Sequence, residues 1–275
     1  MRDQLIRVLY LHREVEGSTK RLSDFIKSLN MQILKDPLNF LLCVIVKGPS
    51  GFNINEITAK LKQSQIKIES ITEMPDDGFD LGAYYRASKI IAPEPTLFLN
   101  SYSRFRNKNA LQMLSDAWDN IPDDSILGTS GSFDCHLSKR PLFLNFRSLL
   151  FLPFSIYWNN SNSFEEDFPS CPNPHIRTTG FICNSSKLNK YFNKAGLPST
   201  KRACYGIELG KYNLTNFFDN KYILSSRNIY TVDKVVEGGF RNQYQQNLLI
   251  SDNNSDYYDN ASIIHKKILS YKSYF

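Results

Sequence analysis

The stretch NFLLCVIVKG at residues 39–48 is a nearly continuous apolar run. A strand covered on both faces has this composition, because neither of its faces meets water. Helical patterns flank it, with STKRLSDFIKSLNMQI at 18–33 and NINEITAKLKQSQ at 53–65. The arrangement predicts a buried strand between two helices, in the interior of a sheet.

The same alternation continues in both directions along the chain. Further strands are predicted at 7–13, 67–74, 95–101 and 125–133, and further helices at 79–91 and 109–121. Repeats at this spacing form βαβ units, which give a mainly parallel sheet with helices on both faces. The predicted fold class is therefore α/β, and ligands are expected outside the carboxyl ends of the strands.

The second half of the chain is less regular. A strand is predicted within 173–182, helices at 185–196 and 201–220, a short β segment at 222–235, and a polar run followed by a last helix at 261–273. No change in composition marks a linker. We therefore expect one domain over residues 1–275 with a C-terminal elaboration.

Composition limits the function classes. The 275 residues carry a net charge of +6, which fits a phosphate-bearing ligand, an anionic membrane surface or nucleic acid. The basic residues are interleaved with acids and no nucleic-acid motif occurs, so no nucleic-acid partner is expected. The five cysteines form no CxxC pair, which indicates reduced thiols in a cytoplasmic protein.

The longest apolar stretch is PLFLNFRSLLFLPFSIYW at 141–158. Asn145, Arg147 and Pro153 interrupt it, which makes it a poor membrane span. It is either a buried helix or loop, or an interfacial patch that gives peripheral contact with the inner face of a membrane.

The segment that follows the first strand excludes two common nucleotide sites. LHREVEGSTKR at 11–21 contains neither GxGxxG nor GxxxxGK[ST]. A dinucleotide-binding fold and a P-loop kinase are therefore not favoured.

Polar clusters follow three predicted strand ends. PDDGFDLGAYYRASK at 75–89 is a turn and helix cap, or a site for sugar hydroxyls or a diphosphate. LFLNSYSRFRNK at 97–108 is an Asn-Ser turn with solvated arginines, or a ligand-binding edge. In PNPHIRTTGFI at 172–182, a strand would place His175 and Arg177 on one face, which suits either a structural histidine or an anion site.

These motifs together resemble a known family. GFDLGAYYRASK, TLFLNSYSRF, GTSGSF and NPHIRTTGFI, in this order, are similar to glycosyltransferases with a GT-A fold from bacterial and large-virus polysaccharide gene clusters, which are distantly similar to rhamnan-synthesis proteins. YGIELGKYNLT and FRNQYQQNLLISDNNSDYY extend the resemblance, which spans roughly residues 7–260. Each motif alone is weakly specific.

The resemblance implies a GT-A-like αβα sandwich and a nucleotide-sugar donor. Residues 1–135 would form the nucleotide-sugar-binding half, and 136–275 the acceptor side and tail. His12, Arg13, Asp77 and Asp80 would lie around the donor, with Asn100, Ser101 and Ser103 where the family keeps an Asp-x-Asp metal motif. This chain has no carboxylate there, which leaves Mg²⁺ or Mn²⁺ in doubt and suggests that Arg104, Arg106, Arg177 or Arg241 neutralises the diphosphate.

Inverting transfer needs a base that takes the proton of the acceptor hydroxyl. Glu208, in YGIELGK, resembles the family's base in position, although it could equally be a surface glutamate paired with Lys211. His175 is the second candidate base, and a retaining mechanism stays open. In the tail, Gln243, Gln246 and Asp252 suit an acceptor site or lid, or else a polar loop and capped helix.

Two functions follow from the sequence. The first is a glycosyltransferase of the EC 2.4, hexosyltransferase type, which moves a sugar to a glycan or lipid-linked acceptor in surface polysaccharide synthesis. The second is a noncatalytic nucleotide- or sugar-binding relative that acts as a partner subunit, which the missing Asp-x-Asp favours. The sequence does not indicate the oligomeric state.

Overall fold

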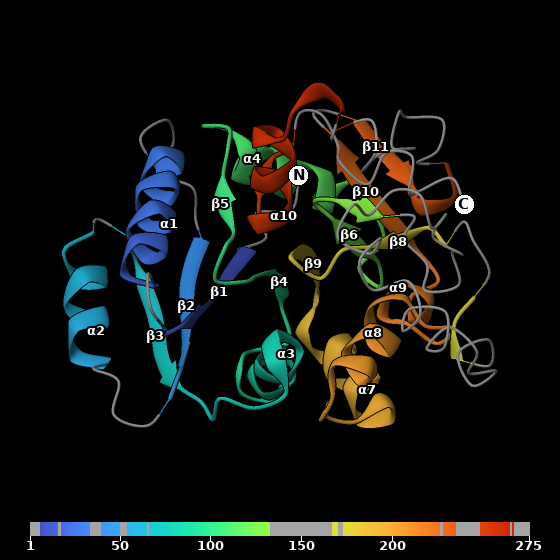
Figure 1. Cartoon of the computed structure of the whole chain (residues 1–275), viewed down its shortest axis with the longest axis horizontal. Helices are drawn as coiled ribbons and strands as arrows, with labels where there is room; N and C mark the ends of the chain where they lie inside the picture. The colour runs from blue at the N-terminus through green and yellow to red at the C-terminus, as the bar shows by residue number, and fades with distance from the viewer. Residues whose placement is uncertain are drawn as a thin grey trace, which may run out of the picture.

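The computed structural model describes residues 6–15, 18–33, 40–49, 54–64, 66–132, 167–169, 173–225, 228–234, 248–264 and 266 (Figure 1). In the first half, the elements are β1 (Ile6–Arg13), α1 (Ser18–Ile33), β2 (Phe40–Lys47), α2 (Ile54–Lys62), β3 (Ile68–Glu73), α3 (Phe79–Ile90), β4 (Pro95–Leu99), β5 (Arg104–Phe105), α4 (Ala110–Asp119), β6 (Ile126–Gly128) and β7 (Gly131–Ser132). In the second half they are β8 (His175–Ile176), β9 (Gly180–Asn184), α7 (Ser185–Ala195), α8 (Lys201–Leu209), α9 (Leu214–Phe217), β10 (Lys221–Ser225), β11 (Asn228–Thr231), the 3₁₀ turn η3 (Val232–Lys234), β12 (Ile250–Ser251) and α10 (Asn253–Asn260).

An eight-stranded sheet has the order β11-β10-β6-β9-β4-β1-β2-β3. β3, β2, β1 and β4 are parallel neighbours, and β6 pairs with β10 in parallel. β9 runs antiparallel between β4 and β6, and β11 runs antiparallel to β10. The predicted α/β class and mainly parallel sheet are confirmed, and this sheet contains strands from both halves of the chain.

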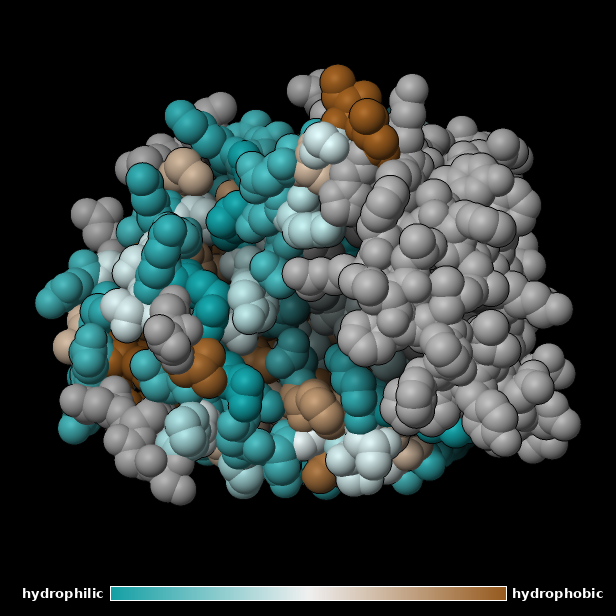
Figure 2. All heavy atoms as spheres, in the orientation of Figure 1, coloured by the Kyte–Doolittle hydropathy of each residue, from teal (hydrophilic) through white to brown (hydrophobic). Residues whose placement is uncertain are grey.

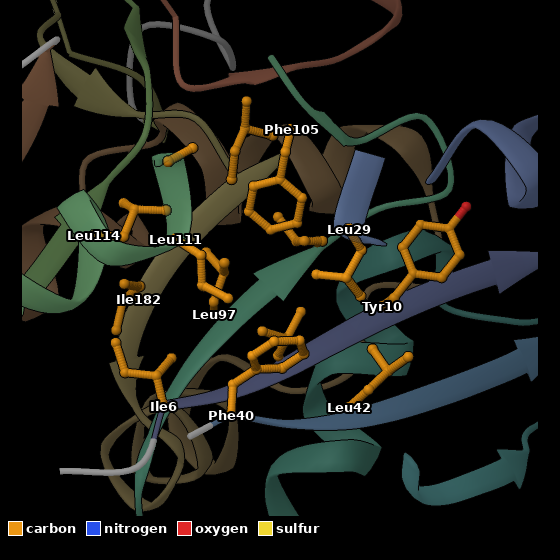
Figure 3. Close-up of a cluster of buried hydrophobic side chains, with 14 of the residues drawn as sticks. Ile6, Tyr10, Leu29, Phe40, Leu42, Leu97, Phe105, Leu111, Leu114 and Ile182 are labelled. Carbon is orange, nitrogen blue, oxygen red and sulfur yellow. The ribbon is translucent and has the colours of Figure 1, made fainter. Parts of the chain in front are cut away.

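Two hydrophobic clusters cover the two faces of the sheet. On one face, alternate strand residues such as Val8 and Leu97 pack against α1, α2 and α4. Figure 3 shows Leu97 and Ile182 gathered with Leu111 and Leu114 of α4. On the other face, Leu9 and its alternate neighbours pack against α3, α7, α8 and α9. Because strand side chains alternate in direction, one apolar run supplies both cores, and the result is an αβα sandwich.

Three predicted elements are divided in the structure. The strand expected at 125–133 is β6 in the large sheet and then β7, which pairs with β8. The strand expected within 173–182 is likewise β8 and β9, in two different sheets. The helix expected at 201–220 ends at Leu209, and the Asn213 side chain caps the separate helix α9 by accepting from the Asn216 amide.

The tail contains the capped helix that was one of the alternatives for this segment. The polar segment around Asn253 forms α10, which begins with a capping box: the Asp252 carboxylate accepts from the Ser255 amide, and the Ser255 hydroxyl accepts from the Asp252 amide. The short polar side chains of this segment suit a loop and are also good helix caps, and the structure shows the second of these uses. Most of the helix predicted at 261–273 lies outside the described residues.

Two properties of the structure are relevant to membrane contact: the length and apolarity of its helices, and the hydropathy of its surface. No helix in the described part of the chain is both long enough and apolar enough to span a membrane. On the face in Figure 2, hydrophilic colours predominate over the described residues and hydrophobic ones form small separate groups. The apolar stretch 141–158 lies outside the described residues, so its predicted membrane contact stays a prediction.

Candidate active site

The carboxyl ends of the parallel strands gather polar residues at one edge of the sheet. β1 and β2 end side by side, with Arg13 in register with Lys47. The turn that follows β3 carries Asp76 and Asp77 and leads directly into α3. Strands of this kind bring residues distant in sequence to one edge, where ligands of α/β proteins bind.

A cavity of about 550 Å³ opens at this edge. Its size is in the range of pockets that hold small-molecule ligands. It lies between the ends of β1 and β2, the start of α3, the loop before α8, and α8 itself, and α3, α7 and α8 lie together below the sheet in Figure 1. It is lined by Arg13, Lys47, Asp76, Asp77, Gly78, Phe79, Asp80, Leu81, Leu197, Pro198, Ser199, Lys201, Cys204 and Glu208.

Three cations line the cavity. The Arg13 guanidinium donates to both carboxylate oxygens of Asp76 at 2.9 Å. Lys47, whose side chain is 2% exposed, lies 3.5 Å from Asp76 and donates to the carbonyl oxygen of Phe79 at 2.6 Å. Burial lowers the pKa of Lys47, while Asp80 and Asp76 oppose the shift. Lys201 stands in the first turn of α8.

Two carboxyl groups in the cavity have raised pKa values. Burial raises the pKa of Asp80, and Lys47 and Lys201 oppose that shift. Burial also raises the pKa of Glu208, against a hydrogen bond of 2.9 Å donated by the Thr178 hydroxyl. The charge of Asp80 also raises the pKa of Glu208. Carboxyl groups tuned upward in a cleft are candidates for acid–base chemistry.

The turn between β3 and α3 contains two consecutive left-handed residues. Gly78 has φ 64° and Phe79 has φ 55°. Glycine adopts this conformation freely, whereas a residue with a Cβ is destabilised by roughly 1–2 kcal/mol. A Cβ on Gly78 would lie 2.7 Å from Leu197, so the glycine also permits the loop before α8 to pack closely against the turn.

The turn after β4 is closed by its own side chains. The Asn100 amide oxygen accepts from the Tyr102 backbone and from the Ser103 hydroxyl, both at 3.0 Å. The Ser103 hydroxyl also lies 2.8 Å from the carbonyl of Thr179. The Asn100 side chain hydrogen-bonds Asp80 as well and lowers its pKa. Asn100 and Ser103 therefore fix this edge of the site, next to Asp80.

This turn does not fit a divalent cation. Mg²⁺ and Mn²⁺ prefer carboxylate oxygens, and residues 100–103 supply none, while the oxygens of Asn100 and Ser103 already take part in hydrogen bonds within the protein. Within the described ranges, no group of three or more His, Cys, Asp or Glu side chains could hold a metal ion.

The other residues that were predicted to bind the donor are engaged with neighbouring side chains or backbone groups. His12 is fully buried, with Nε2 2.7 Å from Glu14, and burial lowers its pKa despite that carboxylate. Asp77 pairs with Arg86 at 2.6 Å, and Ser101 is buried with its carbonyl accepting from Tyr10. Of these three residues, Asp77 lines the cavity.

His175 and Arg177 are engaged in different contacts. His175 Nδ1 lies 2.8 Å from the carbonyl of Asn173, whereas Arg177 pairs with Asp252 at 3.0 Å. Neither lines the cavity. β8 ends at Ile176, and the Arg177 amide still donates to the carbonyl of Ser130 at 3.1 Å, so the predicted common face stays a prediction while the two side chains contact different partners. Arg177 is near enough to lower the pKa of Glu208.

Two of the predicted diphosphate cations are bound to the C-terminal helix. Arg104 pairs with Asp256 at 2.5 Å, and Arg106 pairs with Asp259. Arg241, Gln243 and Gln246 lie outside the described residues, so their predicted roles stay predictions.

The sequence reasoning missed two cations of the cavity. Lys47 is the last residue of an otherwise apolar strand. A charged residue at the carboxyl end of a buried strand could have marked it as a residue of the ligand site. Lys201 begins a helix with no acidic residue in its first turn, although helix N-termini favour negative charge. Both signals indicate a nearby anionic partner.

Three of the solved structures that are similar to this chain are those of a xylosyltransferase, a galactosyltransferase and the protein TarS. Mouse xyloside xylosyltransferase 1, in its apo form, is 12% identical over 91% of this chain and 98% of that one, with a TM-score of 0.47. The galactosyltransferase LgtC, in complex with donor and acceptor sugar analogues, is 13% identical over 80% and 74% of the two chains, with a TM-score of 0.47. S. aureus TarS 1–349 in complex with UDP is 16% identical over 83% and 60%, with a TM-score of 0.49.

The likeness is distant. With identities of 12–16% and TM-scores below 0.5, it carries no argument about reaction or substrate. No protein-family model and no curated protein sequence matches this chain. The functional argument therefore rests on the motifs and on the cavity.

Proposed function

We propose that this chain is a glycosyltransferase that moves a sugar from a nucleotide-sugar donor to a glycan or lipid-linked acceptor, with inversion at the anomeric carbon. The observation that carries the proposal is the cavity at the carboxyl edge of the sheet, where Glu208 and Asp80 face Arg13, Lys47 and Lys201. A nucleotide sugar offers both features that such a lining recognises, a diphosphate and a ring of hydroxyls. The order of the sequence motifs supports the same reading.

Glu208 is the proposed base. In this mechanism its carboxylate takes the proton of the acceptor hydroxyl while that oxygen attacks the anomeric carbon of the donor sugar. The bond from that carbon to the phosphate oxygen breaks, and its electron pair leaves with the nucleoside diphosphate. A raised pKa suits Glu208 to this role, because a base works best when its pKa approaches the operating pH.

The cations of the cavity would balance the leaving diphosphate. Arg13 and Lys47 are fixed by their contacts with Asp76 and Phe79, which supports electrostatic stabilisation without reorganisation. Lys201 would add a third positive charge from the start of α8. No step of this mechanism uses a metal ion, since the turn at 100–103 does not fit one.

The finer parts of the proposal rest on the sequence alone. They are a role in surface polysaccharide synthesis, a cytoplasmic location with peripheral membrane contact through residues 141–158, and a single domain over 1–275. The acceptor-side roles of Gln243, Gln246 and Asp252 and the donor contact of Arg241 belong with them, although Asp252 also caps α10.

A noncatalytic nucleotide- or sugar-binding relative is the second candidate. The observation that favours it is the turn at 100–103, which lacks the carboxylates of an Asp-x-Asp motif and whose oxygens at Asn100 and Ser103 are already hydrogen-bonded. A protein of this kind would bind the donor and release no product.

The test is a donor panel measured for binding and for turnover. UDP and UDP-GlcNAc head the panel as probes that carry the diphosphate and the pyranose that the proposal requires, beside donors with other nucleobases and sugars. A ligand at 100 times its Kd stabilises the native state by about 2.7 kcal/mol, which predicts a melting-point rise of roughly 5–10 °C. Release of the nucleoside diphosphate with sugar transfer supports the enzyme, and binding without release supports the partner subunit. No shift with any donor in the panel overturns both.

A further inference from the structure

The strained turn at the mouth of the cavity has no structural explanation in the core. Phe79 is a bulky residue in the left-handed region at φ 55°, where such side chains are rare. The residue is 43% exposed, and it belongs to neither hydrophobic cluster. A residue that neither fits its backbone nor fills the core is retained for another reason, and strain of this kind gathers at functional sites.

Several contacts hold Phe79 in this conformation. The buried ammonium of Lys47 donates to its carbonyl oxygen at 2.6 Å, which is an unusual use of a cation with 2% exposure. The carbonyl of Gly78 accepts from the Gly82 amide at 2.6 Å. Asp76, two residues before Gly78, accepts hydrogen bonds at both carboxylate oxygens from the Arg13 guanidinium. The backbone of the turn that carries the Phe79 ring is therefore held in place before any ligand arrives.

The ring has surroundings that match a sugar. It lines the cavity together with Leu197 and Pro198, which extend its apolar wall, and with the carboxylates of Asp80 and Glu208. The Lys201 ammonium lies over the ring, 5.6 Å from its centroid, and Phe79 is still exposed to solvent. The face of an aromatic ring is negative and attracts the weakly positive C–H groups of a pyranose face. The hydroxyls at the rim of the pyranose can donate to carboxylates.

We propose that Phe79 is a specificity-determining residue whose ring stacks on the apolar face of a pyranose while Asp80 and Glu208 accept from its hydroxyls. The inference rests on the proposed function, since it places the sugar of the donor or of the acceptor in this cavity. A nucleobase would also stack on an aromatic ring, but it offers few donors to two carboxylates. The sugar is therefore the occupant that the lining favours.

The test compares Phe79→Gly, Phe79→Trp and a matched control, Tyr212→Ala, in the full chain. Tyr212 is 90% exposed and does not line the cavity. Each protein is titrated with the nucleoside diphosphate alone and with the nucleotide sugar, and KM is measured for donor and acceptor separately. Thermal melting is recorded without ligand.

For Phe79→Gly we expect unchanged affinity for the nucleoside diphosphate and about a tenfold rise in Kd for the nucleotide sugar or in KM for the acceptor. Which of the two rises identifies the sugar that is stacked. The melting point should stay the same or rise by roughly 2 °C, because glycine relieves the strained φ. Phe79→Trp should retain most of the affinity, and Tyr212→Ala all of it.

Three results would contradict the inference. Equal loss for the nucleoside diphosphate and the nucleotide sugar would place a nucleobase on the ring. No loss for any ligand would mean that the ring does not touch the substrate. A fall in melting point of Phe79→Gly as large as that of a core truncation would assign the ring a packing role. If the unaltered protein binds no donor and no acceptor, the proposed function fails first, and this inference fails with it.

Discussion

Replacing Glu208 with glutamine removes the proposed base and little else. The Thr178 hydroxyl donates to Glu208 Oε1 at 2.9 Å, and a glutamine keeps an oxygen there to accept the same hydrogen bond. The side chain should therefore hold its position while losing its ability to take a proton. General-base catalysis contributes on the order of 10²–10⁴ in rate, so turnover should fall by this factor, about 2.7–5.4 kcal/mol of barrier.

The free energy of unfolding of Glu208→Gln, unlike its turnover, should not fall at pH 7. Burial raises the folded-state pKa of Glu208 above its unfolded value, so the folded protein binds this proton more tightly. The resulting stabilisation is fully present below the unfolded pKa, about 4.3, and is lost as pH rises through the folded pKa. Once the half-buried Glu208 carboxyl is ionised it is unfavourable in the fold, so at pH 7 Glu208→Gln should be as stable as the unaltered protein or more so.

The assay is release of the nucleoside diphosphate at saturating donor and acceptor, beside donor titration and chemical denaturation. Glu208→Asp withdraws the carboxylate by about 1 Å, which can cost on the order of 10²-fold in rate. Glu56→Gln is the matched control, since Glu56 lies on α2, on the opposite face of the sheet, and pairs with Lys60 in solvent. Turnover by the unaltered protein should fall at acid pH, as Glu208 is protonated, at a higher pH than an exposed glutamate would give.

Retention of more than a tenth of the turnover by Glu208→Gln would refute its role as the base. An equal loss of donor affinity and turnover would assign Glu208 to binding. A marked loss of stability at pH 7 would show that the carboxylate serves the fold, in which case the reasoning from burial and pKa is wrong.

Three further outcomes are expected. Lys47→Met leaves the Phe79 carbonyl without its hydrogen-bond partner. It should lower the free energy of unfolding by about 1–3 kcal/mol, measured by denaturation, and weaken binding of the nucleotide sugar, measured by titration. An unchanged protein would contradict the account of the turn. A chelator should leave donor affinity and turnover unchanged, whereas loss of both, with recovery on adding Mn²⁺, would show a metal that residues 100–103 do not explain. Glu69→Gln should destabilise the protein at pH 7 and progressively less as the solution is acidified. The hydrogen bond with Arg7 holds the pKa of Glu69 low, so that its stabilisation is present above the unfolded pKa of about 4.3 and is lost as pH falls through the folded pKa. A pH-independent effect would argue against this pair.

Much of the fold could be predicted from local pattern. The apolar run of β2 and the helical spacing of α1 each report a short-range property, and their predicted bounds agree with the structure to within a residue. The predictions failed where the path of the chain depends on distant partners. β6 and β7 form one run in the sequence, but β7 leaves the large sheet to pair with β8, some forty residues farther along the chain.

The candidate site was predictable in part for the same reason. Arg13, Asp77 and Asp80 were expected near the donor and Glu208 as the base, and all four line the cavity. His175 was expected to share a face with Arg177, but backbone and carboxylate partners that are remote from the local pattern engage each of them separately.

The sequence by itself determined the order of strands and helices, the parallel character of the sheet and the edge at which polar residues collect, because these follow from periodicity and strand direction. Only the tertiary structure decided which of those polar groups face one cavity. It turned Lys47 from the last residue of a strand into a buried cation beside Asp76, and it placed Phe79 in a conformation that no local pattern requires. Burial and charge proximity act through space, and for that reason the tuned carboxyl groups and the strained ring could be found only in the folded chain.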